Sequence, residues 1–305
     1  MPFLLVFVGI VAVAVYILKN VRYQKTEYYK QTHLSYLQMK FNKGRYGEYL
    51  TYKSLDQLAG YKKYLFNCYI PKADGSTTEL DVILLHESGI YVFESKNYSG
   101  WIFGTETQKQ WTQVLPIGKG ESQKSQFMNP IIQNKVHIKW LQNYIGQEYS
   151  FPIYSFIVFS ERCTLKDITL TSYAHYVVNR YNLIHEVKRN ISLVENRFSS
   201  EKIDELFNKL YPLTQVSEAQ KLAHIMHIYQ GNLAVKKSSN SVDVFEKKES
   251  ACNEDEQAGG EQEKKCPCCG ADLVSRTALK GKRAGRSFWG CSNYPKCRYI
   301  KNIGE

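Results

Sequence analysis

The segment Glu79–Asn97 constrains the fold of this chain more than any other stretch of its sequence. Two apolar runs, Leu80–Leu85 and Ile90–Phe93, flank a short polar turn. This pattern is typical of two strands joined in a hairpin. Each strand carries charged residues at one end, where a buried strand normally continues with apolar ones. The charged positions therefore deserve a functional explanation as well as a structural one.

The register of this hairpin decides which charges meet. A two-residue loop at Glu87–Ser88 places Asp81 directly opposite Glu94, whereas a three-residue loop ending at Gly89 shifts the register by one. Opposed β-carbons lie about 4.5–5.5 Å apart, so the two carboxylates repel unless a cation lies between them. Lys96 projects from the same face as Glu94, because side chains alternate along a strand. The alternative interpretation is a solvated strand end, which an isolated Glu-x-Lys usually is.

This set of side chains suits one kind of chemistry. Carboxylate oxygens are preferred ligands of Mg²⁺ and Mn²⁺. A lysine on the same face can orient a water or stabilise negative charge that develops on a phosphate. Asp81 and Glu94 are therefore candidate ligands of Mg²⁺ or Mn²⁺, and Lys96 is a candidate catalytic residue.

Two predicted helices carry further polar residues. The helix expected at about 45–59 is mostly apolar but contains Glu48, which by itself is more often a solvated charge. Asn129-Pro130 predicts the start of another helix, with Asn as the cap and Pro in the first turn. Gln133 and His137 lie one turn apart near that start, although surface or packing roles are more common for such residues.

Residues of about 43–160 resemble the nuclease-related domain (NERD) family, a branch of the PD-(D/E)xK superfamily. The matching features are Gly47-Glu48, Glu79-Leu80-Asp81, Glu94-Ser95-Lys96 with Gly100, the strand of Trp111, and Asn129-Pro130 with Gln133 and Asn134. The resemblance implies a restriction-endonuclease-like α/β fold, a mixed sheet flanked by helices. It also implies that Glu48 adds a carboxylate to the metal site and that Gln133 joins the catalytic set. Nuclease activity is presumed for this family from its motif.

An uncharged apolar run of 16 residues, Phe3–Leu18, lies near the N terminus and reaches the short end of a membrane span. Three cations, Lys19, Arg22 and Lys25, follow the run and no basic residue precedes it. This asymmetry predicts a single-pass signal anchor, with the bulk of the chain in the cytoplasm. A cleaved signal peptide and a buried core helix are the alternatives. The missing basic residues before the run disfavour the signal peptide.

Cysteines near the C terminus follow a metal-type pattern: Cys266, Cys269, Cys291 and Cys297. Two such pairs are typical of a tetrahedral zinc site, and a segment of this size needs the metal in order to fold. Cys268 is the spare cysteine, although an exchange with a neighbouring cysteine remains open. The segment resembles the topoisomerase-type C4 zinc ribbon, with Trp289 inserted beside Phe288.

Cations and aromatic rings coincide in this ribbon. The candidate nucleic-acid-binding residues are Lys282, Arg283, Arg286, Phe288, Trp289, Tyr294 and Arg298. Cations that contact phosphates and rings that stack on bases suit single-stranded nucleic acid, and we expect DNA. The alternative is a ribbon that docks a protein or has a purely structural role. The net charge of +11 favours a polyanionic partner.

These observations predict six segments: a transmembrane anchor (1–19), a basic juxtamembrane helix (20–43), a nuclease-like domain (44–160), a helical extension (161–231), a disordered linker (232–264) and a zinc ribbon (265–305). The expected function is metal-dependent hydrolysis of nucleic-acid phosphodiesters at a membrane. One alternative is a non-enzymatic nucleic-acid tether that uses an inactive nuclease fold. The other is an adaptor that binds proteins.

Overall fold

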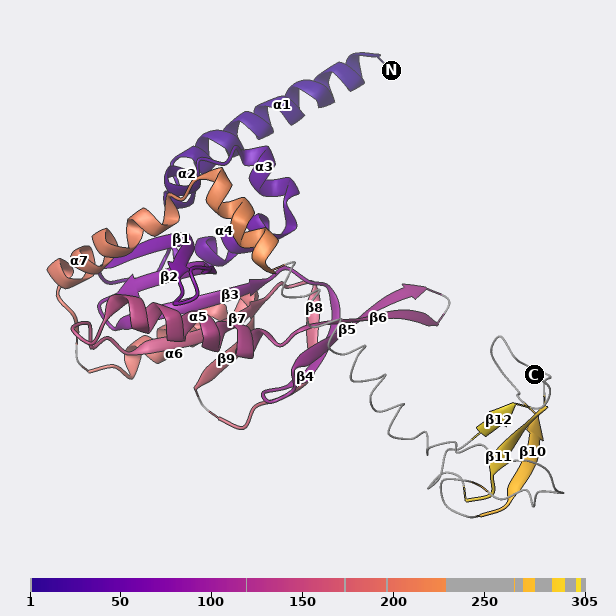
Figure 1. Cartoon of the computed structure of the whole chain (residues 1–305). Helices are drawn as coiled ribbons and strands as arrows, with labels where there is room; N and C mark the ends of the chain where they lie inside the picture. The colour runs from indigo at the N-terminus through magenta and orange to yellow at the C-terminus, as the bar shows by residue number, and fades with distance from the viewer. Residues whose placement is uncertain are drawn as a thin grey trace. The chain divides into compact units, whose positions relative to one another are not determined.

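The computed structural model describes residues 2–118, 120–172, 174–195, 197–228, 266, 271–277, 287–293 and 300–302. The chain forms two compact units, Met1–Met226 and His227–Glu305, whose elements are labelled in Figure 1. The first unit is mixed α/β and contains the candidate active site. The second contains the described strands of the ribbon.

The first unit begins with four helices: α1 (Pro2–Gln24), α2 (Glu27–Thr32), α3 (Tyr36–Phe41) and α4 (Lys43–Leu55). The single juxtamembrane helix expected at 20–43 is instead the end of α1 followed by two short helices. Local capping explains the breaks, because Thr26 caps α2 and Ser35 forms a capping box on α3. His33 ends α2 in the left-handed conformation, with φ of 53°.

The main sheet has five strands in the order β1–β2–β3–β7–β9. Their bounds are Lys62–Pro71, Thr77–His86, Gly89–Lys96, Ile153–Phe159 and His175–Asn179. The first three strands are antiparallel neighbours, and β7 and β9 run parallel to β3. His86 pairs with Gly89 and Val82 with Phe93, so the hairpin loop is the two-residue Glu87–Ser88.

A second mixed sheet has the strand order β6–β5–β4–β8. Its strands are β4 (Gly100–Thr105), β5 (Gln110–Gly118), β6 (Glu121–Met128) and β8 (Cys163–Thr169). The mixed sheet that the sequence predicts is present, but it is accompanied by this second one. The extension expected to be helical from residue 161 onward also begins with strands, because β8 and β9 complete the two sheets.

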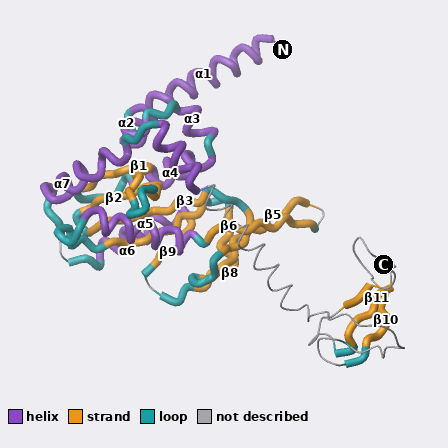
Figure 2. The backbone as a smooth tube through the Cα atoms, viewed as in Figure 1, coloured by secondary structure: helices purple, strands orange, loops and turns teal. Residues whose placement is uncertain are grey.

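Helices cover both faces of the main sheet, whose strands lie between them in Figure 2. They are α5 (Pro130–Ile145), α6 (Arg180–Ser192) and α7 (Ser200–Leu210), followed by a 3-10 turn (Tyr211–Thr214). Alternation along β2 separates two cores. Val82 and Leu84 pack with residues of α4 and α6, whereas Ile83 and Leu85 pack with residues of α5 and α7. The alternation ends at Val82, because Leu80 packs with the second set, so the direction of Asp81 follows from its own contacts.

In the second unit, β10 (Leu273–Thr277), β11 (Ser287–Cys291) and β12 (Ile300–Asn302) form an antiparallel sheet. Cys266, Cys291 and Trp289 are among the described residues. Phe288 is described only in its backbone, as part of β11. The predicted residues and segments that lie outside the described part of the chain are Cys269, Cys297, Lys282, Arg283, Arg286, Tyr294, Arg298 and the linker 232–264.

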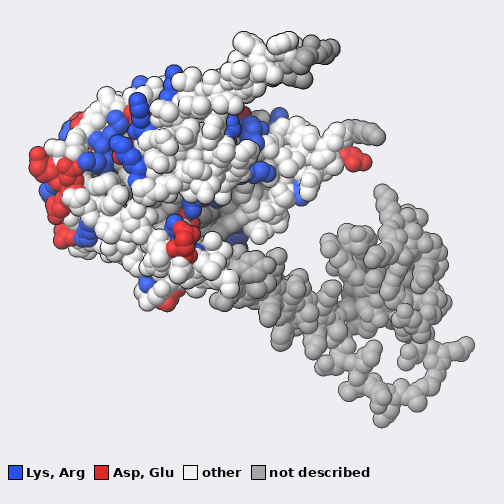
Figure 3. All heavy atoms as spheres, turned by 90° about the horizontal axis from the view of Figure 1, so that it is seen from above, with Lys and Arg blue, Asp and Glu red and all other residues white. Residues whose placement is uncertain are grey.

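Helix α1 differs from the other helices in its exposure. Phe3 is 89% exposed, and most described side chains of the apolar run are exposed as well. In Figure 3 the described outer part of α1 carries neither acidic nor basic side chains. Within the described residues, the segment Val6–Gln24 is long and apolar enough to cross a membrane, a property that a signal sequence shares.

Candidate active site

Asp81, Glu94 and Lys96 come together where the end of β3 lies beside the middle of β2. The backbone amide of Ser95 donates a hydrogen bond of 2.8 Å to Asp81 Oδ2. This contact links the two strands at the level where the hairpin register places Asp81 opposite Glu94. The Lys96 ammonium donates to Glu94 Oε1 at 2.6 Å. The structure thus brings the three residues predicted from the hairpin into one cluster.

Helix α5 contributes two side chains from its first turns. Lys96 Nζ also donates to Gln133 Oε1 at 3.0 Å. His137 Nε2 lies 3.2 Å from Glu94 Oε2, and His137 Nδ1 lies 2.6 Å from the Thr78 hydroxyl. The spacing of one helical turn therefore directs both residues toward β3, with Gln133 on the lysine and His137 on the glutamate.

Glu94 is the most deeply buried carboxylate of the cluster, at 2% exposure. Its Oε1 pairs with Lys96, but its Oε2 forms no hydrogen bond, and the approach of His137 lacks hydrogen-bonding geometry. Burial alone would raise the pKa of the Glu94 carboxyl. The charge of Lys96 and the proximity of His137 outweigh burial and lower that pKa to about 2. Glu94 is therefore a buried carboxylate with one unsatisfied oxygen.

The pKa of Asp81 is shifted in the opposite direction to that of Glu94. Burial and the nearby carboxylates of Glu94 and Glu48 raise the pKa of Asp81 well above its usual value. Lys96 responds to the same negative charge. Burial would lower the pKa of its ammonium, but the carboxylates of Glu94 and Asp81 raise it. The cluster therefore places two acidic groups beside one lysine, and the raised pKa of Asp81 shows that its ionised form is disfavoured unless a further cation binds.

Glu48 reaches the cluster from α4 and is held by three side chains. Its Oε2 accepts hydrogen bonds from the Tyr28 hydroxyl at 3.1 Å and from Asn67 Nδ2 at 2.8 Å, and Arg45 NH1 lies 3.3 Å away. Burial raises the pKa of Glu48, against the opposing effect of Arg45. Gly47 precedes it, and a Cβ there would lie 2.9 Å from Asn97 Cβ, so glycine permits the close approach of α4 to the end of β3.

Asn67 is an unusual residue in β1. It has φ of 51°, in the left-handed region that Asn tolerates better than most residues. The flanking pairs are Phe66 with Val82 and Cys68 with Leu80, so Asn67 interrupts the ladder beside Asp81. A backbone outlier beside a cluster of buried carboxylates is typical of functional sites.

Sequence reasoning missed some of these contacts. Arg45 lies three residues before Glu48 and also pairs with Glu79 at 3.3 Å, and that spacing was a usable signal. Asn67 gave no signal, because its role depends on a backbone conformation within an otherwise regular apolar strand. His137 was noted on the helix, but its contact with Glu94 was not predicted.

The carboxylates of Asp81 and Glu94 are the candidate ligands of a divalent metal ion. Across the part of the chain that the structure describes, no group of three or more His, Cys, Asp and Glu side chains is close enough to hold a metal ion. Mg²⁺ is nevertheless usually held by one or two protein carboxylates and keeps several waters. Asp81 and Glu94 fit that requirement, since Glu94 Oε2 is buried without a hydrogen bond.

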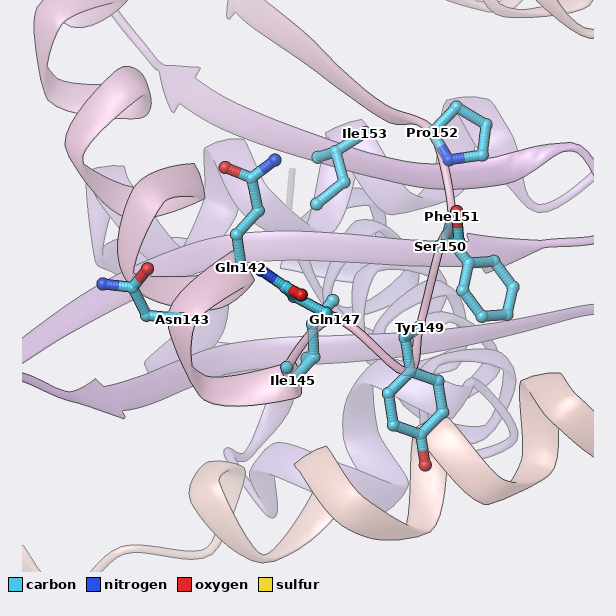
Figure 4. A pocket seen from close by; sticks show the side chains of 10 residues that line it. Gln142, Asn143, Ile145, Gln147, Tyr149, Ser150, Phe151, Pro152 and Ile153 are labelled. Carbon is cyan, nitrogen blue, oxygen red and sulfur yellow. The ribbon is translucent and has the colours of Figure 1, made fainter.

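A pocket of about 650 Å³ lies elsewhere on the first unit (Figure 4). It is lined by the end of α5 and the segment before β7, including Gln142, Tyr149 and Phe151. Its helical wall begins at Gln142, five residues beyond His137, which is about 7 Å along a helix. Neither the carboxylates nor Lys96 line this pocket, so it is separate from the candidate active site.

The ribbon shows two of its four predicted zinc ligands. Cys266 and Cys291 are both buried. The amide of Cys266 donates to the carbonyl of Ala271 at 2.6 Å, and the amide of Asn293 donates to Cys291 Sγ at 3.4 Å. A backbone amide directed at a cysteine sulfur favours the thiolate form, which is the form that binds zinc.

Comparison with known proteins identifies both domains. Residues 43–160 match the family described as nuclease-related domain, and residues 263–305 match the topoisomerase DNA binding C4 zinc finger. The chain therefore carries a nuclease-related domain and a topoisomerase-type zinc ribbon. Both domains point to a function that involves nucleic acid.

Two curated proteins are similar to parts of the chain. An uncharacterized protein of Bacillus anthracis is 29% identical over 188 residues, which cover 61% of this chain and 84% of that protein. DNA topoisomerase 1 of Methanocaldococcus jannaschii is 56% identical over 45 residues, 15% of this chain. The chain spans only 5% of that topoisomerase, so the likeness concerns the ribbon alone. No solved structure gives a significant match.

Proposed function

We propose that this chain is a membrane-anchored, metal-dependent nuclease whose zinc ribbon captures DNA. The observation that carries the proposal is the cluster of Asp81, Glu94 and Lys96, in which a buried glutamate oxygen has no hydrogen-bond partner. A fold alone does not imply activity, because function depends on the site that the fold carries. This site places two neighbouring acidic groups, one of which has a raised pKa, beside a single buried lysine, an arrangement that a purely structural role does not require.

Asp81 and Glu94 would hold Mg²⁺ or Mn²⁺, which when bound supplies Lewis-acid stabilisation to the phosphate and activates water. Lys96 is held between Glu94 and Gln133, where its ammonium can position the attacking water and stabilise negative charge on the phosphate. Glu48 adds negative charge from α4. His137 orients Glu94 through their approach of 3.2 Å.

The membrane part of the proposal is supported by α1. This helix runs unbroken from Pro2 to Gln24. Its last turn carries Tyr23, which is 1% exposed and packs in the core of the first unit. The anchor would thus be continuous with the folded domain, and the cations after the apolar run would keep that domain in the cytoplasm.

The ribbon part of the proposal is supported by the match to a DNA-binding zinc finger. Zn²⁺ would be held by Cys266, Cys269, Cys291 and Cys297. Within residues 282–298, the basic side chains would bind phosphates and the aromatic rings would stack on bases. Joining a DNA-binding module to the nuclease domain raises the effective concentration of DNA at the active site.

The test is cleavage of labelled single- and double-stranded DNA by the full chain in detergent, with Mg²⁺, Mn²⁺ or EDTA. Asp81→Asn and Lys96→Ala should both abolish metal-dependent cleavage. Cleavage that survives in both variants would refute the proposed site. In parallel, Cys291→Ser should weaken DNA binding, and binding by the unaltered chain should fall steeply as salt rises.

One observation favours a binding function without catalysis. Lys96 occupies Glu94 Oε1 at 2.6 Å, so an ion pair already neutralises part of the metal site. A chain that binds DNA in a salt-dependent manner but cleaves neither substrate with either metal would be a membrane-held tether. Binding that is insensitive to salt would instead favour a protein partner for the ribbon.

A further inference from the structure

Helix α3 exposes an apolar face that no described element covers. Phe41 is 80% exposed and Leu37 is 44% exposed, although both are large apolar side chains. They lie four residues apart, on one side of the helix. The exposed cation Lys40 stands beside Phe41, and Lys43 follows at the start of α4. This face therefore combines large apolar side chains with basic ones, and this composition is typical of helices that lie in a membrane interface.

The opposite side of α3 is fixed to the domain and to α1. Met39 is fully buried in the core that includes Tyr23 and Tyr28. The ring of Tyr36 lies 5.7 Å from that of Tyr23 and 6.0 Å from that of Tyr16. Met39 and Tyr36 pack inward and fix the orientation of α3. Phe41 and Leu37 are therefore exposed because they lie on the opposite side of a packed helix.

The contact between Tyr36 and Tyr16 sets the level of α3 along α1. Tyr16 lies in the last turn of the apolar run Phe3–Leu18, so α3 packs beside the end of that run. The Tyr23 hydroxyl donates to the carbonyl of Leu34 at 2.9 Å, which ties the end of α1 to the residues that precede α3. A bilayer around α1 would consequently reach α3 as well.

Charge in this region has the sign that anionic lipid attracts. Residues 19–45 contain seven Lys and Arg and a single acid, Glu27. Glu27 is already paired with Lys30 at 2.7 Å. Basic residues next to a membrane span are attracted by anionic headgroups, and Phe and Leu partition into the boundary between headgroups and acyl chains.

We infer that α3 is a second membrane contact, which inserts Phe41 and Leu37 into the boundary region of an anionic bilayer while Lys40 and Lys43 lie on lipid phosphates. This inference rests on the proposed membrane anchor. Two contacts on one rigid group of helices fix the orientation of the nuclease-related domain relative to the bilayer, which a single helix does not. We take lipid as the partner because α3 packs beside Tyr16 of the apolar run and because the charge of this region is basic.

The test uses the full chain reconstituted in vesicles of phosphatidylcholine and phosphatidylglycerol, with and without brominated acyl chains. In Phe41→Trp, the new tryptophan should be quenched by the brominated lipid beyond the quenching of the native tryptophans. Leu193→Trp is the matched control, since Leu193 is 72% exposed just beyond α6 and should give no added quenching. Both substitutions are at exposed positions and leave the core unchanged.

Flotation of the vesicles separates the two proposals. If the chain does not float with vesicles, both the anchor and the contact through α3 are refuted. If it floats but Phe41→Trp shows no added quenching, or no more than Leu193→Trp, the anchor stands and the contact through α3 is refuted. Added quenching at residue 41 alone supports the inference.

Discussion

Two buried glutamates of the first unit, Glu106 and Glu94, differ in how many hydrogen bonds their carboxylate oxygens accept. Glu106 follows β4 and is 6% exposed. Its Oε2 accepts hydrogen bonds from the amides of Thr171 and Ser172, each at 2.9 Å, and from the Thr171 hydroxyl at 3.0 Å. Its Oε1 accepts from the Ser172 hydroxyl at 2.9 Å and from Lys135 at 3.2 Å. These donors, with those of Ser172 first, lower the pKa of Glu106 to about 2.

Glu94 is buried at least as deeply but has one hydrogen-bonded oxygen and one without a partner. It also lies beside Asp81, whose pKa is raised by burial and by neighbouring carboxylates. Both carboxylate oxygens of Glu106 are hydrogen-bonded, and these bonds join the loop at 171–172 to the end of β4. The raised pKa of Asp81 shows that its ionised form lacks sufficient compensating positive charge. We therefore propose that Glu106 stabilises the fold, whereas Asp81 and Glu94 hold a ligand that supplies positive charge.

The largest expected effect separates the two glutamate sites by activity. Asp81→Asn should reduce metal-dependent DNA cleavage about 10³-fold or more, because several kcal/mol of transition-state stabilisation depend on a correctly held metal. Glu106→Gln should leave the rate per folded molecule within a few-fold of the unaltered chain. Initial cleavage rates, corrected for the folded fraction, measure both. Equal losses in the two variants would remove the distinction.

A smaller effect is expected at His137, which contacts Glu94 without belonging to the metal ligands. His137→Gln should lower cleavage or metal affinity about 10–100-fold, the usual range for residues that orient a ligand. A titration of Mn²⁺ against cleavage rate shows whether the loss is in affinity or in the rate at saturation. An unchanged titration curve would mean that His137 merely packs against β3.

The stability effects of the same substitutions should have opposite signs. Asp81→Asn should raise Tm in the absence of divalent cations by about 2–4 °C, the shift that roughly 1 kcal/mol gives in a domain of this size. Glu106→Gln should lower Tm by several degrees, because buried donors lose their acceptor. Thermal unfolding in EDTA measures both. A lower Tm for Asp81→Asn would show that this carboxylate stabilises the fold.

The pH dependence sharpens the comparison further. The pKa of Glu106 is about 2 in the folded chain, below its ordinary value of 4.5. Its contribution to stability is therefore present above about pH 4.5 and is lost as the pH falls toward 2. The stability difference between the unaltered chain and Glu106→Gln should shrink over that range. A difference that stays constant between pH 5 and pH 3, estimated from denaturant unfolding, would contradict the assignment.

Much of the candidate site was predictable because it depends on local rules. The two-residue loop Glu87–Ser88, one of the two that the sequence leaves open, places Asp81 opposite Glu94, and strand alternation then places Lys96 on the face of Glu94. Asn129-Pro130 likewise predicted where the helix that carries Gln133 begins. The catalytic roles of these residues stay predictions.

Other features depend on tertiary structure and gave no local signal. Strand β8 is polar and largely exposed, so it lacks the continuous apolar run from which β3 was predicted. Asn67 adopts a left-handed conformation and donates a hydrogen bond to Glu48, which lies on a helix 19 residues earlier in the chain. The division of residues 20–43 into short helices follows from caps at Thr26 and Ser35, which were not weighed against the helical spacing of the apolar residues.

The central claim, that Asp81 and Glu94 form a site for a divalent cation, is tested most directly by Mn²⁺ binding to the full chain. Electron paramagnetic resonance distinguishes free from bound Mn²⁺ in the unaltered chain, Asp81→Asn, Glu94→Gln and Glu106→Gln. The account predicts that binding is lost in the first two variants and retained in Glu106→Gln. Binding that persists unchanged in Asp81→Asn and Glu94→Gln would contradict it.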